Sequence, residues 1–342
     1  MTTVDQRPAT PDSAKGAPAA QAAALVAGLV VLAVVALLSM AVGAHAVAPG
    51  EVVNALLSYD GSSDQMIVRD VRVPRAALAI GVGAALAVAG VLVQTLSRNP
   101  LAEPGILGVT AGAGFAMTLG GAFGIATSPG AELVTTTAGA VLATVLVASV
   151  GRTSPLRLVL TGVALTAVLK GVSLGMRMML PDVFDKYRFW SVGSLAGREQ
   201  LPMALPLVTI GLAVVAALLL GRSLNAVALG ETVARTLGTD VTRVRFATLA
   251  LITILSGAAT AVAGPILFVG LIVPHVARVL ARGSVPWLTA YSAVLGPILL
   301  LVADAASRVL LPTGELPVAI VTAFIGGPVL IWAVRKYGTG TL

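Results

Sequence analysis

The chain has 342 residues, of which 57% are hydrophobic and only 11% are charged. Soluble domains carry about a quarter of charged residues, so this composition excludes an ordinary soluble protein. We attribute the net charge of +7 to basic loops lying against anionic lipid headgroups, not to nucleic-acid binding. With no cysteine and only two histidines, the chain has little from which to build a metal or thiolate site. We expect no catalytic residue, metal ligand or cofactor.

The N-terminal segment 1–20 is rich in Pro, Ala and Thr and lacks periodicity, which predicts a disordered cytoplasmic tail. The apolar run that follows ends near His45, where Ala-His-Ala resembles a signal-peptide cleavage site. This run is much longer than the about 7–15 residues of a signal-peptide core. We therefore interpret it as an uncleaved first membrane helix. A second short cytoplasmic tail is expected at 338–342.

Ten apolar segments approach the ~20 residues that a helix needs to cross a bilayer. They are 22–47, 73–96, 106–127, 131–150, 156–180, 201–221, 244–264, 267–281, 287–310 and 316–335. The eighth is short and contains Gly270 and Pro274, so we expect it to be a partial or tilted span. The predicted fold class is all-α: a polytopic transmembrane helical bundle of about ten helices over residues 21–337.

Charge is distributed unequally between the two sides of this arrangement. If the first segment crosses outward and the others alternate, the outer connections hold most of the acidic residues. The inner connections hold Arg98, Arg152, Arg157, Arg222, Arg235, Arg243, Arg245, Arg278, Arg282, Arg335 and Lys336, among others. Basic residues in short loops resist translocation. The pattern predicts a multi-pass protein of the inner or plasma membrane with both termini in the cytoplasm.

An internal repeat links two of the predicted spans. The sequence GAALAVAG at 83–90 recurs with one substitution as GAATAVAG at 257–264. These segments lie five spans apart, so they cross the membrane in opposite directions, as in an inverted-topology repeat. We expect repeat halves at roughly 66–181 and 240–336. Small-xxx-small steps at 108–112 and 120–124 predict close packing of helices.

Seven segments resemble the permease subunits of ABC importers for iron–siderophore complexes and cobalamin, the FecCD-type family. They are RVPR at 72–75, QTLSRNPLAEPGILG at 94–108, FWSVGSLAG at 189–197, LGETVARTLG at 229–238, FVGLIVPHVAR at 268–278, ADAASR at 303–308 and ELP at 315–317. They follow the family's order across nearly all of the chain after residue 20. The resemblance implies a subunit that carries ferric siderophores into the cytoplasm, or alternatively cobalamin or haem.

The resemblance also implies partners. These are a second permease subunit, identical or related, two copies of a cytoplasmic ATP-binding subunit, and an extracytoplasmic substrate-binding protein, with lipid around the spans. The chain itself has no G-x-x-x-x-G-K-[ST] phosphate loop, so a separate motor is expected and this chain is not itself an enzyme. A gradient-driven carrier is the alternative, but it would need acidic or histidine relays at membrane depth. No acidic residue lies in the middle of a predicted span.

The connection after the sixth span has apolar residues at 229, 233, 234 and 237, a spacing that predicts a short amphipathic helix. By resemblance it is the coupling segment that docks on the ATPase. Its residues are Leu229, Gly230, Glu231, Ala234, Arg235, Leu237 and Gly238. The alternative is an ordinary connector lying on the membrane surface.

Three arginines fall at the predicted outer ends of spans. By resemblance, Arg72, Arg75 and Arg308 meet acidic residues of the substrate-binding protein, since guanidinium–carboxylate pairs orient a partner and speed its encounter. The alternative is that Arg308 pairs with Asp304 one turn earlier, and that Arg72 and Arg75 anchor the membrane interface. Both roles could coexist.

A cytoplasmic gate is implied in the loop after the second span, with Asn99 and Leu101 as the closing side chains. Pro100 and Pro104 interrupt the helix there. Thr153 and Ser154 are a weaker candidate for a second constriction. The alternative for both is a plain turn between helices.

Lys170 and Arg177 lie seven residues apart in the fifth span, on one helix face, and Lys170 is near mid-membrane. A cation at that depth is costly and normally faces a cavity or a partner. These residues either line the translocation path for an anionic cargo, pair with a carboxylate, or, for Arg177, reach toward the outer surface. His275 is interpreted as a packing residue.

Overall fold

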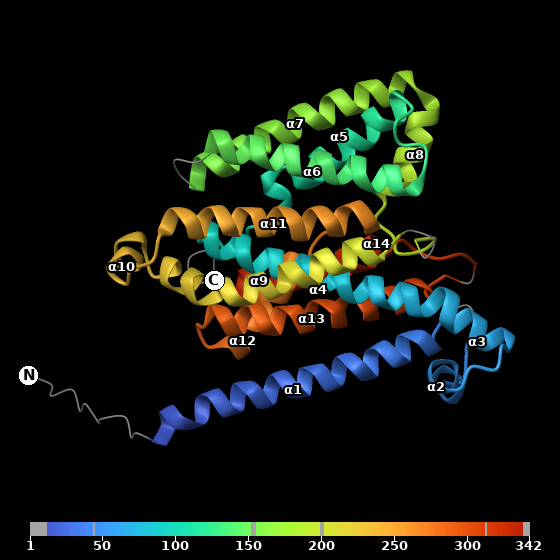
Figure 1. Ribbon diagram of the computed structural model, residues 1–342, viewed down its shortest axis with the longest axis horizontal. Helices are drawn as coiled ribbons and strands as arrows, with labels where there is room; N and C mark the ends of the chain where they lie inside the picture. Colours follow the sequence, from blue (N-terminus) through green and yellow to red (C-terminus); the bar gives the residue numbers. More distant parts are fainter. Residues whose placement is uncertain (1–11, 44, 152–154, 199–201, 312, 338–342) are drawn as a thin grey trace, which may run out of the picture.

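The computed structural model describes residues 12–43, 45–151, 155–198, 202–311 and 313–337, all helical or irregular with no strand in these ranges (Figure 1). Ten helices correspond to the ten predicted spans. They are α1 (Asp12–Ala41), α4 (Val73–Ser97), α5 (Val109–Ala122), α6 (Pro129–Gly151), α7 (Pro155–Met179), α9 (Ala204–Ala228), α11 (Val241–Ala263), α12 (Val269–Ala281), α13 (Val285–Ser307) and α14 (Val318–Tyr337). The all-α prediction is confirmed.

Seven of these helices are long and apolar enough to cross a membrane, judged by length and composition, and α5, α12 and the apolar part of α14 are shorter. The eighth span is short as predicted, with 13 residues and Pro274 inside it. The predicted disordered tail is wrong for residues 12–20, because α1 begins at Asp12. Alanine is the strongest helix former, and this stretch is rich in it.

Short elements mark the two ends of the bundle. The helix α10 (Glu231–Thr236) lies at one end, which we call the α10 end. The helices α2 (Pro49–Leu57), α3 (Ser63–Ile67) and α8 (Pro181–Ser191) lie at the other, which we call the α3 end (Figure 1). A π-helical turn η1 (Val68–Arg72) leads from α3 into α4, and a 3-10 turn η2 (Pro104–Leu107) precedes α5.

The helix α4 is the centre of the fold and packs against α9, α11, α12 and α13. Glycines let two of these neighbours touch its backbone. A Cβ on Gly83 would lie 2.6 Å from the carbonyl oxygen of Gly296 in α13. A Cβ on Gly90 would overlap the carbonyl of Gly270 in α12. Without a hydrophobic effect inside a bilayer, such close approach supplies much of the packing between helices.

The two repeat segments lie in α4 and α11, which pack against each other. Figure 1 shows that they run in opposite directions, since α4 starts at the α3 end and α11 starts beside α10. The opposed directions agree with an inverted repeat. The exact limits of the two halves remain a prediction. The helices α5 to α8 form a group beside α11, with the small-residue contact of Gly112 on Gly139 holding α5 to α6.

Candidate functional site

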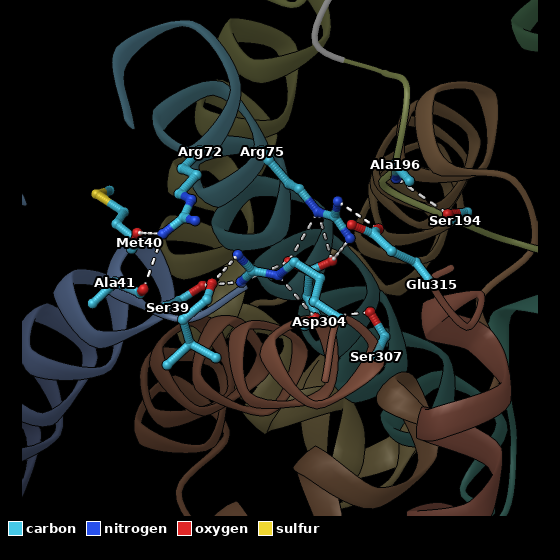
Figure 2. A network of polar contacts seen from close by, with 12 residues as sticks. Ser39, Met40, Ala41, Arg72, Arg75, Ser194, Ala196, Asp304, Ser307 and Glu315 are labelled. Atoms are coloured by element: carbon cyan, nitrogen blue, oxygen red, sulfur yellow. Dashed lines mark hydrogen bonds and ion pairs between the residues drawn. The ribbon is translucent and has the colours of Figure 1, made fainter. Parts of the chain in front are cut away.

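Asp304 is the centre of an arginine cluster at the α3 end, formed by Arg72, Arg75, Arg308, Asp304 and Glu315 (Figure 2). Arg75 donates from Nε and Nη2 to Oδ1 of Asp304, at 3.0 and 2.9 Å. Arg308 approaches the other carboxylate oxygen, with Nη2 3.2 Å from Oδ2. Arg75 also pairs with Glu315 through Nη1 at 2.8 Å. The carboxylate of Asp304 therefore links α4, through Arg75, to the C-terminal end of α13, through Arg308.

The other arginine contacts of the cluster reach the end of α1. Arg72 donates from Nη1 to the carbonyls of Met40, at 2.6 Å, and Ala41, at 2.9 Å. Arg308 donates to the Val42 carbonyl at 2.7 Å and to the Ser39 hydroxyl at 2.9 Å. The last carbonyls of a helix have no partners within it and carry the negative end of its dipole, so two guanidinium groups there stabilise α1.

The three arginines, which the sequence suggests as docking residues at the outer surface, are buried in the structure. Arg72, Arg75 and Arg308 are each 6% exposed, and Asp304 is 1% exposed. The alternative interpretation of Arg308, an ion pair with Asp304, is present in the structure. The docking role stays a prediction, and in the described structure the three side chains are occupied by contacts within the chain.

The predicted coupling segment does contain a helix, but a shorter one than the pattern suggested. Leu229, Val233 and Leu237 are 64%, 43% and 64% exposed, whereas Ala234 is 0% exposed and belongs to the core. Gly230 and Gly238 both have positive φ values, 124° and 77°, which favour glycine. The exposed apolar face therefore consists of the three larger residues, and Ala234 anchors the segment to the bundle.

An ion pair connects this segment to α11. Arg245 contacts Glu231 through Nη2 and Oε1, and the two side chains are 31% and 42% exposed. Glu231 is the first residue of α10, where a carboxylate also suits the helix dipole. The orientation of α10 thus depends on a residue one turn into α11.

The predicted gate loop leaves α4 through Arg98, whose φ of 51° ends the helix. Asn99 Oδ1 accepts from the amide of Leu101 at 2.9 Å, which fixes the turn. Asn99 and Leu101 are both exposed, so their side chains lie on the surface of this single chain. The second candidate pair, Thr153 and Ser154, lies outside the described residues.

The two cations of α7 separate in the structure. Lys170 is exposed and forms no ion pair within the described part of the chain. Arg177 instead folds onto neighbouring helices, with its guanidinium 3.6 Å from the centroid of the Tyr187 ring and 3.2 Å from Thr118 Oγ1. The cation–π contact places Arg177 between α5 and α8. Of the pair, only Lys170 remains available to a path or a partner.

Two polar links, one buried and one partly buried, were not identified from sequence. Gln94 donates to the Gly270 carbonyl at 3.1 Å and accepts from Arg278 Nη2 at 2.6 Å, so it ties α4 to α12. Glu103 accepts from the amide of Phe268 at 3.3 Å, just before α12 begins. In both links the two partners lie in segments 94–108 and 268–278, which resemble the FecCD-type family. That resemblance is the one sequence signal that could have suggested contact between the two segments.

No group of three His, Asp or Glu side chains that could hold a metal occurs among the residues that the structure describes. A sequence model named FecCD transport family matches residues 31–336. The chain belongs to the FecCD transport family. Members of this family are permease subunits of ABC importers and not enzymes.

Three relatives of the FecCD chain illustrate the range of the family. The ferric enterobactin transport system permease protein FepD of Escherichia coli is 44% identical, covering 95% of this chain and 99% of that protein. The probable siderophore transport system permease protein YfiZ of Bacillus subtilis is 36% identical, covering 84% and 87%. The hemin transport system permease protein HmuU of Yersinia pestis is 33% identical, covering 78% and 82%.

A solved structure with the same fold is described as an inward-facing conformation of a metal-chelate type ABC transporter. It superposes with a TM-score of 0.82 at 28% sequence identity, covering 91% of this chain and 98% of that one. The FecCD chain is therefore a multi-pass membrane permease subunit of the ABC importer class. Its family implies a partner permease and ATPase subunits.

Proposed function

We propose that this permease carries ferric siderophores from an extracytoplasmic binding protein into the cytoplasm. The observation that carries the proposal is the near full-length similarity to a ferric enterobactin permease. Haem is the second candidate, because a hemin permease also aligns over most of its length. In either case the power for transport comes from ATP hydrolysis on partner subunits, since this chain has no phosphate loop.

The α10 end faces the cytoplasm in this proposal. Support comes from the basic residues that collect there: Arg98 of the gate loop donates to the Val227 carbonyl of α9 at 3.2 Å, and Arg245 pairs with Glu231. An excess of basic residues in the short connections at one end favours the inner side for that end. Leu229, Val233 and Leu237 then present their exposed apolar face to the ATPase, and Asn99 and Leu101 close the inner end of the path.

The orientation can be tested with single cysteines, because the natural chain has none. Cysteines replacing Thr236 in α10 and Ser62 before α3 are expected to react with a membrane-impermeant maleimide from opposite sides. Intact cells should label only the Ser62 position, and inside-out vesicles only the Thr236 position. Labelling of both positions in intact cells would overturn the orientation.

The path is proposed to lie between two permease subunits, beside α7 and α14. Support comes from large apolar side chains that α14 leaves exposed, including Phe324 and Trp332, and from exposed Lys170 on α7. A cation beside the path suits ferric complexes with net negative charge. Arg177 is not expected to contact the cargo directly, because its guanidinium group is held against the Tyr187 ring.

Docking of the binding protein is proposed at the arginine cluster. Its three guanidinium groups face two carboxylates, Asp304 and Glu315, which leaves local positive charge for an acidic partner. Salt screens the attraction between this net positive charge and an acidic partner, so affinity for the binding protein should fall as ionic strength rises. Arg72→Gln, which leaves the Asp304 pairs in place, should weaken docking. Unchanged affinity in a variant of normal thermal stability would leave Arg72 as an anchor of α1 only.

The cargo is tested by uptake in a strain deleted for this permease. Labelled ferric enterobactin, a ferric hydroxamate, haem and cobalamin are supplied separately, with and without the restored gene. We expect restored uptake of a ferric siderophore and none of cobalamin. Restoration of haem uptake alone would replace the siderophore assignment with the haem alternative.

A further inference from the structure

A cavity of about 430 Å³ opens between two groups of helices near the α10 end. It lies between α4, α6, α7, α11 and η2. Most of its lining is aliphatic or aromatic, including Val93, Leu96, Val145, Ala148, Phe246 and Leu249. Its size is within the range of small-molecule sites, about 300–1,000 Å³. Apart from Arg245, whose pair with Glu231 orients α10, none of its lining residues has a role described above.

The mouth of the cavity faces the side of the bundle. Two lining residues, Val145 of α6 and Phe246 of α11, are 58% and 76% exposed. Both helices are long enough to span the bilayer, and they lie side by side in Figure 1. An opening framed by exposed apolar side chains of two spans is an opening to hydrocarbon. The natural occupant of that space is a lipid chain, not a hydrated cargo.

The polar groups of the cavity lie where the helices approach the α10 end. They are Arg245 and Thr242 from the first two turns of α11, Ser97 at the end of α4, and Ser149 near the end of α6. Arg157 and Arg243 are exposed next to lining residues at the same end, and Arg243 pairs with Asp240 at 3.0 Å. The site is therefore apolar along its length, with the Arg245 guanidinium group among its lining near the α10 end. That combination matches an acyl chain joined to an anionic headgroup, as basic pockets between spans do generally.

We propose that this cavity binds one acyl chain of an anionic phospholipid, with the lipid phosphate at Arg245. Arg245 already contacts Glu231, the first residue of α10. A phosphate and the Glu231 carboxylate compete for the same guanidinium group. Occupancy by an anionic lipid therefore loosens the link that positions the ATPase-docking helix. Anionic lipid content would then regulate coupling, a role that is independent of which cargo is carried.

The binding test uses the purified full-length chain in its complex, exchanged into nanodiscs or mild detergent and examined by native mass spectrometry. Phosphatidylglycerol and phosphatidylcholine with identical acyl chains are the probes. We expect preferential retention of phosphatidylglycerol by about fivefold, the effect of one basic residue near a headgroup. Arg245→Gln should abolish the preference, and Arg245→Lys should keep it. Arg222→Gln, an exposed arginine of α9 outside the cavity, is the matched control.

Two further variants separate the apolar and charged parts of the site. Ala148→Trp fills the cavity and should reduce retention of both lipids. Glu231→Gln frees Arg245 and should increase retention of phosphatidylglycerol alone. Equal retention of the two lipids by the natural chain, or an Ala148→Trp variant that binds as the Arg222 control does, would overturn the site. No response to Glu231→Gln would overturn the competition with α10.

Discussion

Asp304 shows how one buried carboxylate can hold several elements at once. It is 1% exposed and pairs with Arg75 and Arg308, which are themselves buried. Removing one partner of a buried ion pair leaves the others desolvated without compensation. The residue therefore matters to stability through the arginines that it would strand.

Asp304→Asn should accordingly lower the free energy of unfolding by about 3–5 kcal/mol. Thermal unfolding of the purified chain measures the effect. Asp185→Asn is the control, because Asp185 pairs with Arg188 on the surface, where both side chains are more than half exposed. That change should cost less than about 1 kcal/mol. Equal losses in the two variants would contradict the central role of Asp304.

The helices meet through small residues, and the consequences can be tested at single positions. Gly90→Ala places a methyl group against the Gly270 carbonyl of α12, so α4 and α12 must separate. We expect a loss of about 1–3 kcal/mol, typical of overpacking, seen as a lower unfolding temperature. Gly171→Ala in α7 meets nothing within 4 Å and should leave the isolated subunit unchanged or slightly more stable. A tolerated Gly90→Ala would mean that α4 and α12 adjust easily.

The structure divides the α10 segment into an exposed apolar face, which we propose docks on the ATPase, and a buried anchor. Leu237→Glu changes an exposed side chain and should leave the subunit folded while reducing ATPase stimulation and uptake together. Ala234→Glu buries a carboxylate at a fully buried position and should lower the amount of folded protein instead. Copurification with the ATPase, followed by hydrolysis and uptake assays, distinguishes the two. A Leu237→Glu variant that couples normally would refute the docking face.

The number and order of spans could be predicted because apolar length is a strong local signal. The split between Leu237 and Ala234 could not, since both fit one helical stripe and only the packing of α10 on α9 and α11 decides which is covered. The burial of Arg75 could likewise not be predicted from the sequence. Its position at a span end says nothing about Asp304, which is 229 residues away and reaches it only through the fold.

At the scale of the whole molecule, the exposed face of α7 leaves Lys170 without a carboxylate in the described part of the chain. A lysine at this depth is costly unless it meets water or a partner. We therefore expect the second permease of the assembled importer to cover this face, with the cargo path beside Lys170.

Lys170→Met should therefore keep the subunit folded, because no buried acid in the described ranges loses its partner. Uptake of anionic ferric complexes should fall several-fold more than uptake of neutral ones. Thermal stability and uptake measured on the same variant check both parts. Lower stability would mean that the lysine pairs with an acid in the assembly, and unchanged uptake of every cargo would remove it from the path.

The attachment of α1 has a consequence for biosynthesis. Its apolar window has a mean hydropathy of 2.8, the highest of the seven long spans, and only 11% of that window is buried. Its terminal contacts with Arg308 join residues 266 and 269 positions apart. At about 5–20 residues per second, the ribosome needs roughly 13–50 s to make that intervening chain. During this interval α1 lies in lipid without its contact to Arg308. Its high mean hydropathy makes α1 stable in the bilayer before that contact forms.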